Sequence, residues 1–302
     1  MARYLLGSHA TNPHNTARAR LKRARLRVAR TITTTTQYVL DTKGSKEART
    51  GPLIIAHRGN RDVAPENTLP AFASAIAAGV DYIEMDVVLS KDGVAMVIHD
   101  ETLQGTTNGN GKVSQLTAHQ IQFLDAGAWF SPAFAGTRVP TFTQFAELMA
   151  DKVAKERGVQ ILLEFKGDWT PDQVRTVTDI ATAHKLQGRT VLKSFSPTTV
   201  RSQFEVAPHW RRGVLTYGDY PGLFELCQEV GATMLNPDIL EVAADPTLIA
   251  KIHHAGMQAM VWTANDVDHW ELLLELGADG FITDRPQYLA GWLAGRKSLK
   301  EI

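Results

Sequence analysis

Short runs of apolar, often β-branched residues alternate with amphipathic helical segments along most of this 302-residue chain. The alternation begins near Leu53 and produces eight main strand–helix units before the C-terminus. A doubly wound sheet of this length usually has fewer strands or a second domain. Eight consecutive units within roughly 250 residues are typical of a (β/α)₈ barrel, so we predict an α/β fold of the TIM-barrel type.

The regular alternation is interrupted between residues 101 and 139. Residues 106–111 are Thr, Asn and Gly in close succession, and three aromatic residues come after them, Trp129, Phe130 and Phe134. Clusters of such turn-forming residues between periodic segments indicate loops. We therefore predict a small insertion after the second strand region of the barrel.

The formal net charge of zero conceals two oppositely charged parts. Residues 1–50 contain 11 basic and two acidic residues, whereas residues 51–302 contain 21 basic and 30 acidic residues. We expect residues 1–50 to form a basic, disordered tail and residues 51–302 to form the barrel domain. An organelle-targeting segment or a surface-binding arm is the alternative for the tail, because basic residues there alternate with apolar residues at helical spacing.

The composition also bounds the partners and the location of the protein. Cys227 is the single cysteine, so the chain has no intrachain disulfide, and we expect this residue to be a small buried hydrophobe. No apolar run approaches the ~18 residues that a membrane span needs. With no net basic charge, we expect no nucleic-acid partner. A cytoplasmic location is the simplest expectation, and organelle targeting by the tail is the alternative; the sequence does not indicate an oligomeric state.

Charged side chains occur within the predicted strands, near their carboxyl ends. Glu84 and Asp86 are two residues apart on one strand, so they face the same side of it, and Glu164 and Lys166 do the same on another strand. Three carboxylates at one barrel mouth repel one another unless a cation neutralises them. Carboxylate oxygens suit Mg²⁺ or Ca²⁺, so we predict one divalent cation at Glu84, Asp86 and Glu164.

Two histidines also end predicted strands, His57 after the first strand and His99 after a hairpin strand. Histidine ordinarily titrates near neutral pH, so two such groups beside a cation suit acid–base chemistry on a phosphoester. Arg58 adds a planar donor group that matches phosphate oxygens.

These residues belong to a series of motifs that resembles the glycerophosphodiester phosphodiesterases, in particular the bacterial members. The resemblance covers about residues 53–293. The motifs are His57-Arg58-Gly59, Pro65-Glu66-Asn67-Thr68, Glu84-x-Asp86, Ser90-Lys91-Asp92-Gly93, His99-Asp100, Thr107-Asn108-Gly109, Leu124-Asp125-Ala126-Gly127, Val139-Pro140-Thr141, Glu164-Phe165-Lys166 and Ile282-Thr283-Asp284-Arg285-Pro286.

The resemblance implies a hydrolase that needs Mg²⁺ or Ca²⁺ and splits small glycerophosphodiesters into sn-glycerol 3-phosphate and an alcohol. It implies metal ligands at Glu84, Asp86 and Glu164, and an acid–base pair formed by His57 and His99. Which histidine is the acid and which the base stays open. Further roles that it implies are phosphate contacts from Arg58 and Lys166, a place for Glu66 near the metal and the first histidine, and a part for Trp262 in the wall around the glycerol.

Three positions depart from the family pattern. They are Asn60, Phe165 and Lys193, and Lys193 stands where a serine is more usual. We expect Phe165 to point outward. An inward Lys193 would add positive charge and alter the preference for the alcohol.

Two other functions compete with this one. A lysophospholipase D or phosphoinositide phospholipase-like activity on the same barrel would need an apolar rim, for which Trp129, Phe130 and Phe134 are candidates. A non-catalytic binding barrel would require the loss of a ligand or a histidine, and none is missing.

Overall fold

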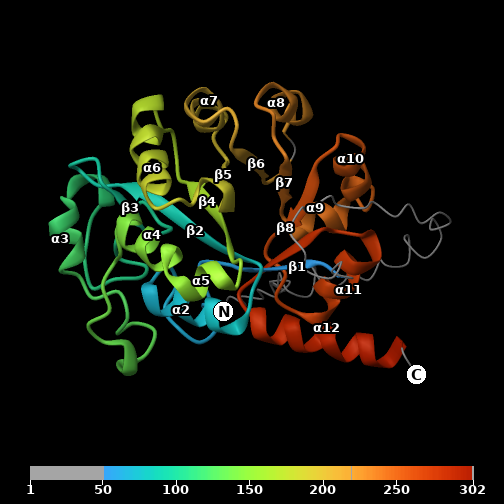
Figure 1. Ribbon diagram of the computed structural model, residues 1–302, viewed down its shortest axis with the longest axis horizontal. Helices are drawn as coiled ribbons and strands as arrows, with labels where there is room; N and C mark the ends of the chain where they lie inside the picture. The colour runs from blue at the N-terminus through green and yellow to red at the C-terminus, as the bar shows by residue number, and fades with distance from the viewer. Residues whose placement is uncertain (1–50, 219, 301–302) are drawn as a thin grey trace, which may run out of the picture.

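Eight parallel strands close into a barrel in the computed structural model, which describes residues 51–218 and 220–300 (Figure 1). Strand β1 completes the ring by pairing with β2 on one side and β9 on the other. The predicted (β/α)₈ fold is therefore confirmed, while the basic tail of residues 1–50 lies outside the described residues. The barrel strands are β1 (Leu53–Ala56), β2 (Tyr82–Leu89), β4 (Gln160–Phe165), β5 (Thr190–Ser194), β6 (Arg211–Thr216), β7 (Met234–Pro237), β8 (Gln258–Val261) and β9 (Gly280–Thr283).

Helices connect the strands and cover the outside of the barrel (Figure 1). Several begin at a Thr, Ser or Asp whose side chain accepts a hydrogen bond from the first turn, as Thr170 does from the backbone of Gln173. The helices are α2 (Leu69–Ala78), α4 (Phe142–Ala150), α5 (Lys152–Glu156), α6 (Pro171–Ala183), η3 (Gln187–Arg189), α7 (Pro197–Val206), α8 (Leu223–Glu229), α9 (Ile239–Ala244), α10 (Leu248–His254), α11 (Val267–Leu276) and α12 (Pro286–Lys300).

The insertion builds a small core of its own beside the barrel. It starts from β3 (Ala95–Val97), which pairs antiparallel with β2, and continues through η1 (Val113–Gln115), α3 (Ala118–Gln122) and η2 (Pro132–Phe134). Its buried apolar residues pack separately from the main core and include Met96, Ile98, Leu103, Val113, Ile121 and Val139.

Alternate residues of the strands face opposite sides of the barrel wall. Phe165 points outward into the core beneath the helices, as predicted, and packs edge-on against Trp169. Met85 on β2 points outward in the same way. Inside the barrel, an apolar layer precedes the charged layer by two residues along each of three strands. These inward pairs are Tyr82 and Glu84 on β2, Leu162 and Glu164 on β4, and Val191 and Lys193 on β5. Apolar side chains thus fill the barrel interior beneath the charged layer, and the charged side chains lie toward the carboxyl ends of the strands.

Helix boundaries differ from the apolar pattern in two places. The pattern predicts one helix over residues 142–157, but the structure has α4 and α5, separated at Asp151. Asp151 is extended, with ψ 150°, and its side chain accepts a hydrogen bond from the backbone of Val153. Helix α9 was not expected, and it forms because Asp238 and Glu241 make a reciprocal capping box at its start.

Two composition-based expectations can be compared with the structure. Cys227 is buried in α8, and burial raises the pKa of its thiol to about 11, so the expected small hydrophobe is confirmed. Within residues 51–218 and 220–300, no helix is both long enough and apolar enough to cross a bilayer.

Candidate active site

Three carboxylates meet at the carboxyl end of the barrel. Glu84 and Asp86 extend from β2, and Glu164 extends from β4, where it is the register partner of Asp86. All three side chains are buried, and one oxygen from each lies within 4.8 Å of the others. They converge as the two-residue spacing predicts, because the strands on which they lie are neighbours.

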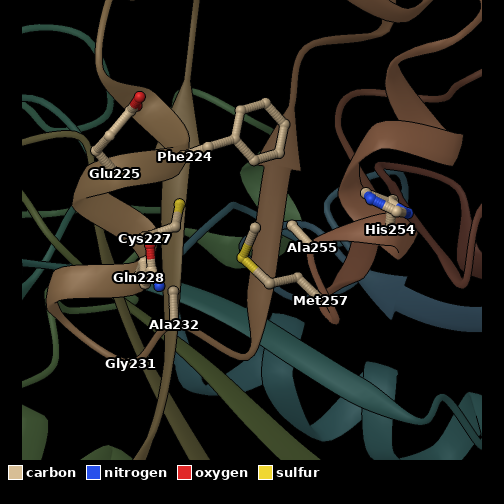
Figure 2. A pocket seen from close by; sticks show the side chains of 9 residues that line it. All are labelled: Phe224, Glu225, Cys227, Gln228, Gly231, Ala232, His254, Ala255 and Met257. Atoms are coloured by element: carbon tan, nitrogen blue, oxygen red, sulfur yellow. The ribbon is translucent and has the colours of Figure 1, made fainter.

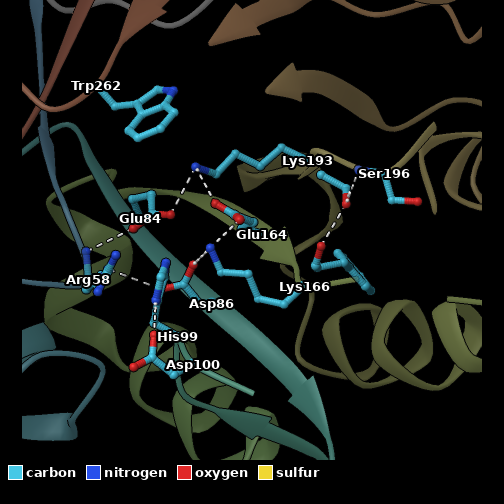
Figure 3. Close-up of polar contacts among 12 residues, drawn as sticks. Arg58, Glu84, Asp86, His99, Asp100, Glu164, Lys166, Lys193, Ser196 and Trp262 are labelled. Atoms are coloured by element: carbon cyan, nitrogen blue, oxygen red, sulfur yellow. Dashed lines mark hydrogen bonds and ion pairs between the residues drawn. The ribbon is translucent and has the colours of Figure 1, made fainter. Parts of the chain in front are cut away.

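Two lysines form ion pairs with this carboxylate triad, defined as Glu84, Asp86 and Glu164 (Figure 3). The Nζ of Lys166 lies 3.0 Å from Oδ1 of Asp86 and also contacts Oε1 of Glu164. The Nζ of Lys193 lies 2.9 Å from Oε1 of Glu84 and 3.4 Å from Oε2 of Glu164. Lys193 therefore points inward and adds positive charge to the site, and its effect on the preference for the alcohol stays a prediction.

The electrostatics of the triad favour its ionised form. Burial by itself raises the pKa of Asp86, but Lys166 and Arg58 outweigh burial and lower that pKa well below its usual range. Burial likewise raises the pKa of Glu84, and Lys193 makes the largest opposing contribution, so this pKa is lowered too. Both lysines have raised pKa values despite their burial. Charges of both signs are thus stably present within this site.

Arg58 and Asn67 approach the triad from the loop after β1. The backbone N–H of Arg58 donates to Oε2 of Glu84 at 2.9 Å, and Nδ2 of Asn67 donates to Oδ2 of Asp86 at 2.8 Å. Both residues have the left-handed backbone that non-glycine residues rarely adopt, with φ 56° and 54°. Such strain persists where surrounding contacts enforce it, which is common at functional sites.

Glu66 acts on this loop through arginines. Its Oε1 accepts a hydrogen bond of 2.6 Å from Nη1 of Arg58, and its other oxygen pairs with Arg61. The resemblance implied a place for Glu66 near the metal and the first histidine. In the structure, Glu66 holds the guanidinium of Arg58, whose Nε lies 3.6 Å from Asp86.

Each strand-end histidine has a carboxylate partner. Nδ1 of His57 lies 2.7 Å from Oδ1 of Asp284, and Nδ1 of His99 lies 2.7 Å from Oδ1 of Asp100. An ionised carboxylate accepts hydrogen bonds but cannot donate them, so each Nδ1 carries the proton. Each Nε2 is then the ring nitrogen left to exchange a proton in the site.

The two histidines flank the triad. His57 comes directly after Ala56, the register partner of Ile83, so it lies beside Glu84 of the neighbouring strand. The His99 ring lies beside Asp86 (Figure 3). Figure 3 shows His99 and Trp262 on opposite sides of the triad.

Asp284 is a site residue to which the sequence assigned no role. Burial raises the pKa of its carboxyl, but His57, Arg61 and Asn265 outweigh burial and lower that pKa to about 2. Nδ2 of Asn265 donates to its second oxygen at 2.7 Å. Its position directly after the last strand could have indicated a role in the site, because that strand pairs with β1, which His57 follows directly.

Trp262 stands in an aromatic group at the rim. Its ring packs edge-on against Phe195, with centroids 5.6 Å apart, and lies 6.3 Å from the ring of Tyr217. Its Nε1 donates to the backbone oxygen of Asn236, which fixes the indole. Phe195 and Tyr217 are exposed, so this side of the mouth offers apolar surface to a ligand.

The aromatic residues of the insertion pack mainly on one another. Trp129 contacts Phe130 edge-on, Phe130 contacts Phe134 in the same way, and Nε1 of Trp129 donates to the backbone oxygen of Ala126. Trp129 is nevertheless 45% exposed, so this aromatic group is only partly packed.

A separate cavity lies on the outside of the barrel between α8 and α10, lined by residues that include Phe224, Cys227, His254 and Met257 (Figure 2). Its lining runs along α8 from Phe224 to the loop after that helix and includes no residue of the triad. We assign no chemistry to it.

Comparison with known proteins gives a consistent result. The model of the glycerophosphoryl diester phosphodiesterase family matches residues 57–288. A glycerophosphodiester phosphodiesterase from Caldanaerobacter subterraneus subsp. tengcongensis is 34% identical over 239 residues, which cover 78% of this chain and 96% of that protein.

Solved structures agree. A glycerophosphodiester phosphodiesterase from Agrobacterium tumefaciens has 31% identity and a TM-score of 0.68, and the match covers 80% of this chain and 100% of that one. A phosphodiesterase from Oleispira antarctica, solved in complex with the product sn-glycerol-3-phosphate, has 26% identity and a TM-score of 0.73, with 80% and 97% covered.

Proposed function

Because this chain belongs to the glycerophosphoryl diester phosphodiesterase family, we propose that it hydrolyses small glycerophosphodiesters to sn-glycerol 3-phosphate and an alcohol, using one divalent cation and two histidines. The observation that carries this proposal is the buried triad at the barrel mouth, flanked by His57 and His99. The product bound to the Oleispira antarctica relative supports the choice of substrate class.

The donor set of the triad fits a hard cation. Glu84, Asp86 and Glu164 offer only carboxylate oxygens, which are the preferred ligands of Mg²⁺ and Ca²⁺, and neither choice is favoured over the other. The lowered pKa values of Glu84 and Asp86 keep them ionised, as ligands must be. When bound, the cation would supply positive charge against the phosphoryl oxygens.

Arg58 and Lys166 are the proposed phosphate contacts. Both are largely buried, and nearby carboxylates raise both pKa values, so both side chains are positively charged at neutral pH. Glu66 orients Arg58 by accepting a hydrogen bond from its guanidinium, and it also pairs with Arg61. Charge that develops on the phosphoryl oxygens during the reaction is thereby stabilised by groups already in place.

His57 and His99 are the proposed acid–base pair. One Nε2 takes a proton from the nucleophile, which is either water or a free hydroxyl of the glycerol, and the other Nε2 protonates the departing alcohol. In the net reaction water is added across the bond between phosphorus and the oxygen of the alcohol. Asp284 and Asp100 hold the two rings in the tautomer that this exchange needs.

Trp262 supplies the proposed wall around the glycerol. The indole lies at the rim beside Phe195 and Tyr217, and its apolar face suits the carbon chain of glycerol. The lysophospholipase D or phosphoinositide phospholipase-like alternative is less well supported, since the matching family model and the similar proteins are glycerophosphodiester phosphodiesterases.

The test is a hydrolysis assay on chelator-treated protein with added Mg²⁺ or Ca²⁺. Glycerophosphocholine, glycerophosphoethanolamine, glycerophosphoinositol and lysophosphatidylcholine are compared at equal concentration. We expect glycerophosphodiesters to be cleaved only after a cation is restored, with sn-glycerol 3-phosphate as the product. Full activity in excess chelator would contradict the metal site, and preferential cleavage of lysophosphatidylcholine would contradict the substrate class.

A further inference from the structure

Lys193 is a charged residue of the site to which the proposed reaction assigns no role. It lies on β5, as the register partner of Glu164, and its side chain is 2% exposed. Its ammonium lies between Oε1 of Glu84 and Oε2 of Glu164, at 2.9 Å and 3.4 Å. A buried ammonium needs such partners, because water is not available to solvate it.

The chain's own groups contact all six oxygens of the triad. Lys193 contacts one oxygen of Glu84 and one of Glu164, and Lys166 contacts the second oxygen of Glu164 and one of Asp86. The remaining two oxygens accept hydrogen bonds from the backbone of Arg58 and the side chain of Asn67. A divalent cation that binds the triad must therefore share oxygens with these groups or displace them.

Lys166 and Lys193 differ in their freedom to yield. Lys166 is 15% exposed at the end of β4, so its flexible stem can carry the ammonium toward the mouth. Lys193 is enclosed within the barrel, one layer above the apolar interior residue Val191. Its positive charge stays next to Glu84 and Glu164 when another cation arrives, and like charges at such short range repel strongly in a buried site.

We propose that Lys193 is a built-in competitor of the divalent cation, which lowers the affinity of the triad for metal and stabilises the protein when no metal is bound. This inference rests on the metal site of the proposed function. The residue at position 193 then sets how much free Mg²⁺ or Ca²⁺ the enzyme needs.

Isothermal titration of CaCl₂ and MgCl₂ into chelator-stripped, full-length protein tests this proposal. Lys193→Gln removes the charge and keeps a hydrogen-bond donor, Lys193→Arg keeps the charge, and Lys155→Gln is the control at an exposed lysine of α5. We expect Lys193→Gln to bind the cation about tenfold more tightly or better, as removal of a coupled competitor predicts. The other two variants should bind with an affinity close to that of the wild type.

Thermal unfolding with and without Ca²⁺ is the second measurement. Loss of Lys193 leaves Glu84 and Glu164 less well neutralised, so Lys193→Gln should have a lower Tm in chelator and a larger increase in Tm with Ca²⁺ than the wild type. Equal or weaker binding by Lys193→Gln, or a Ca²⁺-induced increase no larger than that of the wild type, would overturn the inference and leave the proposed function intact. Absence of binding by every protein would overturn both.

Discussion

At the scale of the residue, the two proposed proton carriers differ from the other histidines of the described chain by their place beside the triad. Replacement of either His57 or His99 by Ala should lower kcat by about 10²–10⁴-fold, since each removes one proton transfer. Steady-state assays with glycerophosphocholine measure the loss. His254→Ala is the control, because that ring is exposed on α10. Full activity in both active-site variants would refute the mechanism.

The carboxylate partners of the two histidines should differ in importance. Asp284 is largely buried and is fixed by Asn265, whereas Asp100 is about half exposed. Asp284→Asn can stabilise the wrong tautomer of His57, which in comparable pairs lowers kcat by up to about 10⁴-fold. We expect a smaller loss for Asp100→Asn, because water can replace the lost acceptor. Measured kcat values in the reverse order would contradict this assignment.

At the scale of the element, a repeating pattern in the sequence is the most reliable guide to structure. The alternation of strands and helices predicted the barrel, and the two-residue spacing of Glu84 and Asp86 predicted their common face. Asp284 was not assigned a role, since its contact with His57 depends on closure of the barrel between the first and last strands. Helix α9 was not predicted, because a helix of six residues is too short to show a helical period in its apolar positions.

The junction between β1 and α2 depends on a close backbone approach at Gly59. This residue has φ 81°, and a Cβ there would lie 2.8 Å from the backbone carbon of Ala71. Gly59→Ala should therefore lower the free energy of unfolding by roughly 2–3 kcal/mol and should also reduce activity by moving Arg58. Gly93→Ala is the matched control, with φ 77° and nothing within 4 Å, and should cost only about 1 kcal/mol. Equal losses in denaturant titrations would contradict this dependence on close packing.

An ion pair between α10 and the start of β9 should make stability depend on pH. Nε2 of His253 lies 2.8 Å from Oδ2 of Asp279, and this hydrogen bond raises the pKa of His253. A raised folded-state pKa adds stability below the unfolded pKa of about 6.5, and that stability is lost as pH rises through the folded value.

We therefore expect His253→Gln to lower the free energy of unfolding by at most about 1 kcal/mol at pH 5.5, and by less at pH 9. Urea titrations at the two pH values measure the difference, and His254→Gln on the same helix is the control. A loss that grows toward high pH would have the wrong sign for this pair.

At the scale of the whole molecule, closure of the barrel is what assembles the site. His57 comes directly after the first strand and Asp284 directly after the last, yet their side chains are 2.7 Å apart because β1 and β9 are neighbours. Glu164 and Lys193 come from strands between these ends. The proposed chemistry therefore requires the complete ring of strands, and each of its groups comes from residues 51–302.

The separation of charge along the chain leads to the last prediction. Residues 1–50 carry a formal net charge of +9 and the remainder carries −9, yet all of the site residues belong to the remainder. We propose that residues 51–302 form the catalytic domain and that the basic tail acts independently of it. Deletion of residues 1–50 should leave kcat on glycerophosphocholine within about twofold, a barrier change of less than 1 kcal/mol, since none of the proposed site residues lies in the tail. Co-sedimentation with vesicles that contain anionic lipid should decrease on deletion, and binding of the full chain should weaken as salt is raised. Loss of activity on deletion would show that the two parts act together, and salt-insensitive binding would show that the tail does not bind the membrane through its charge.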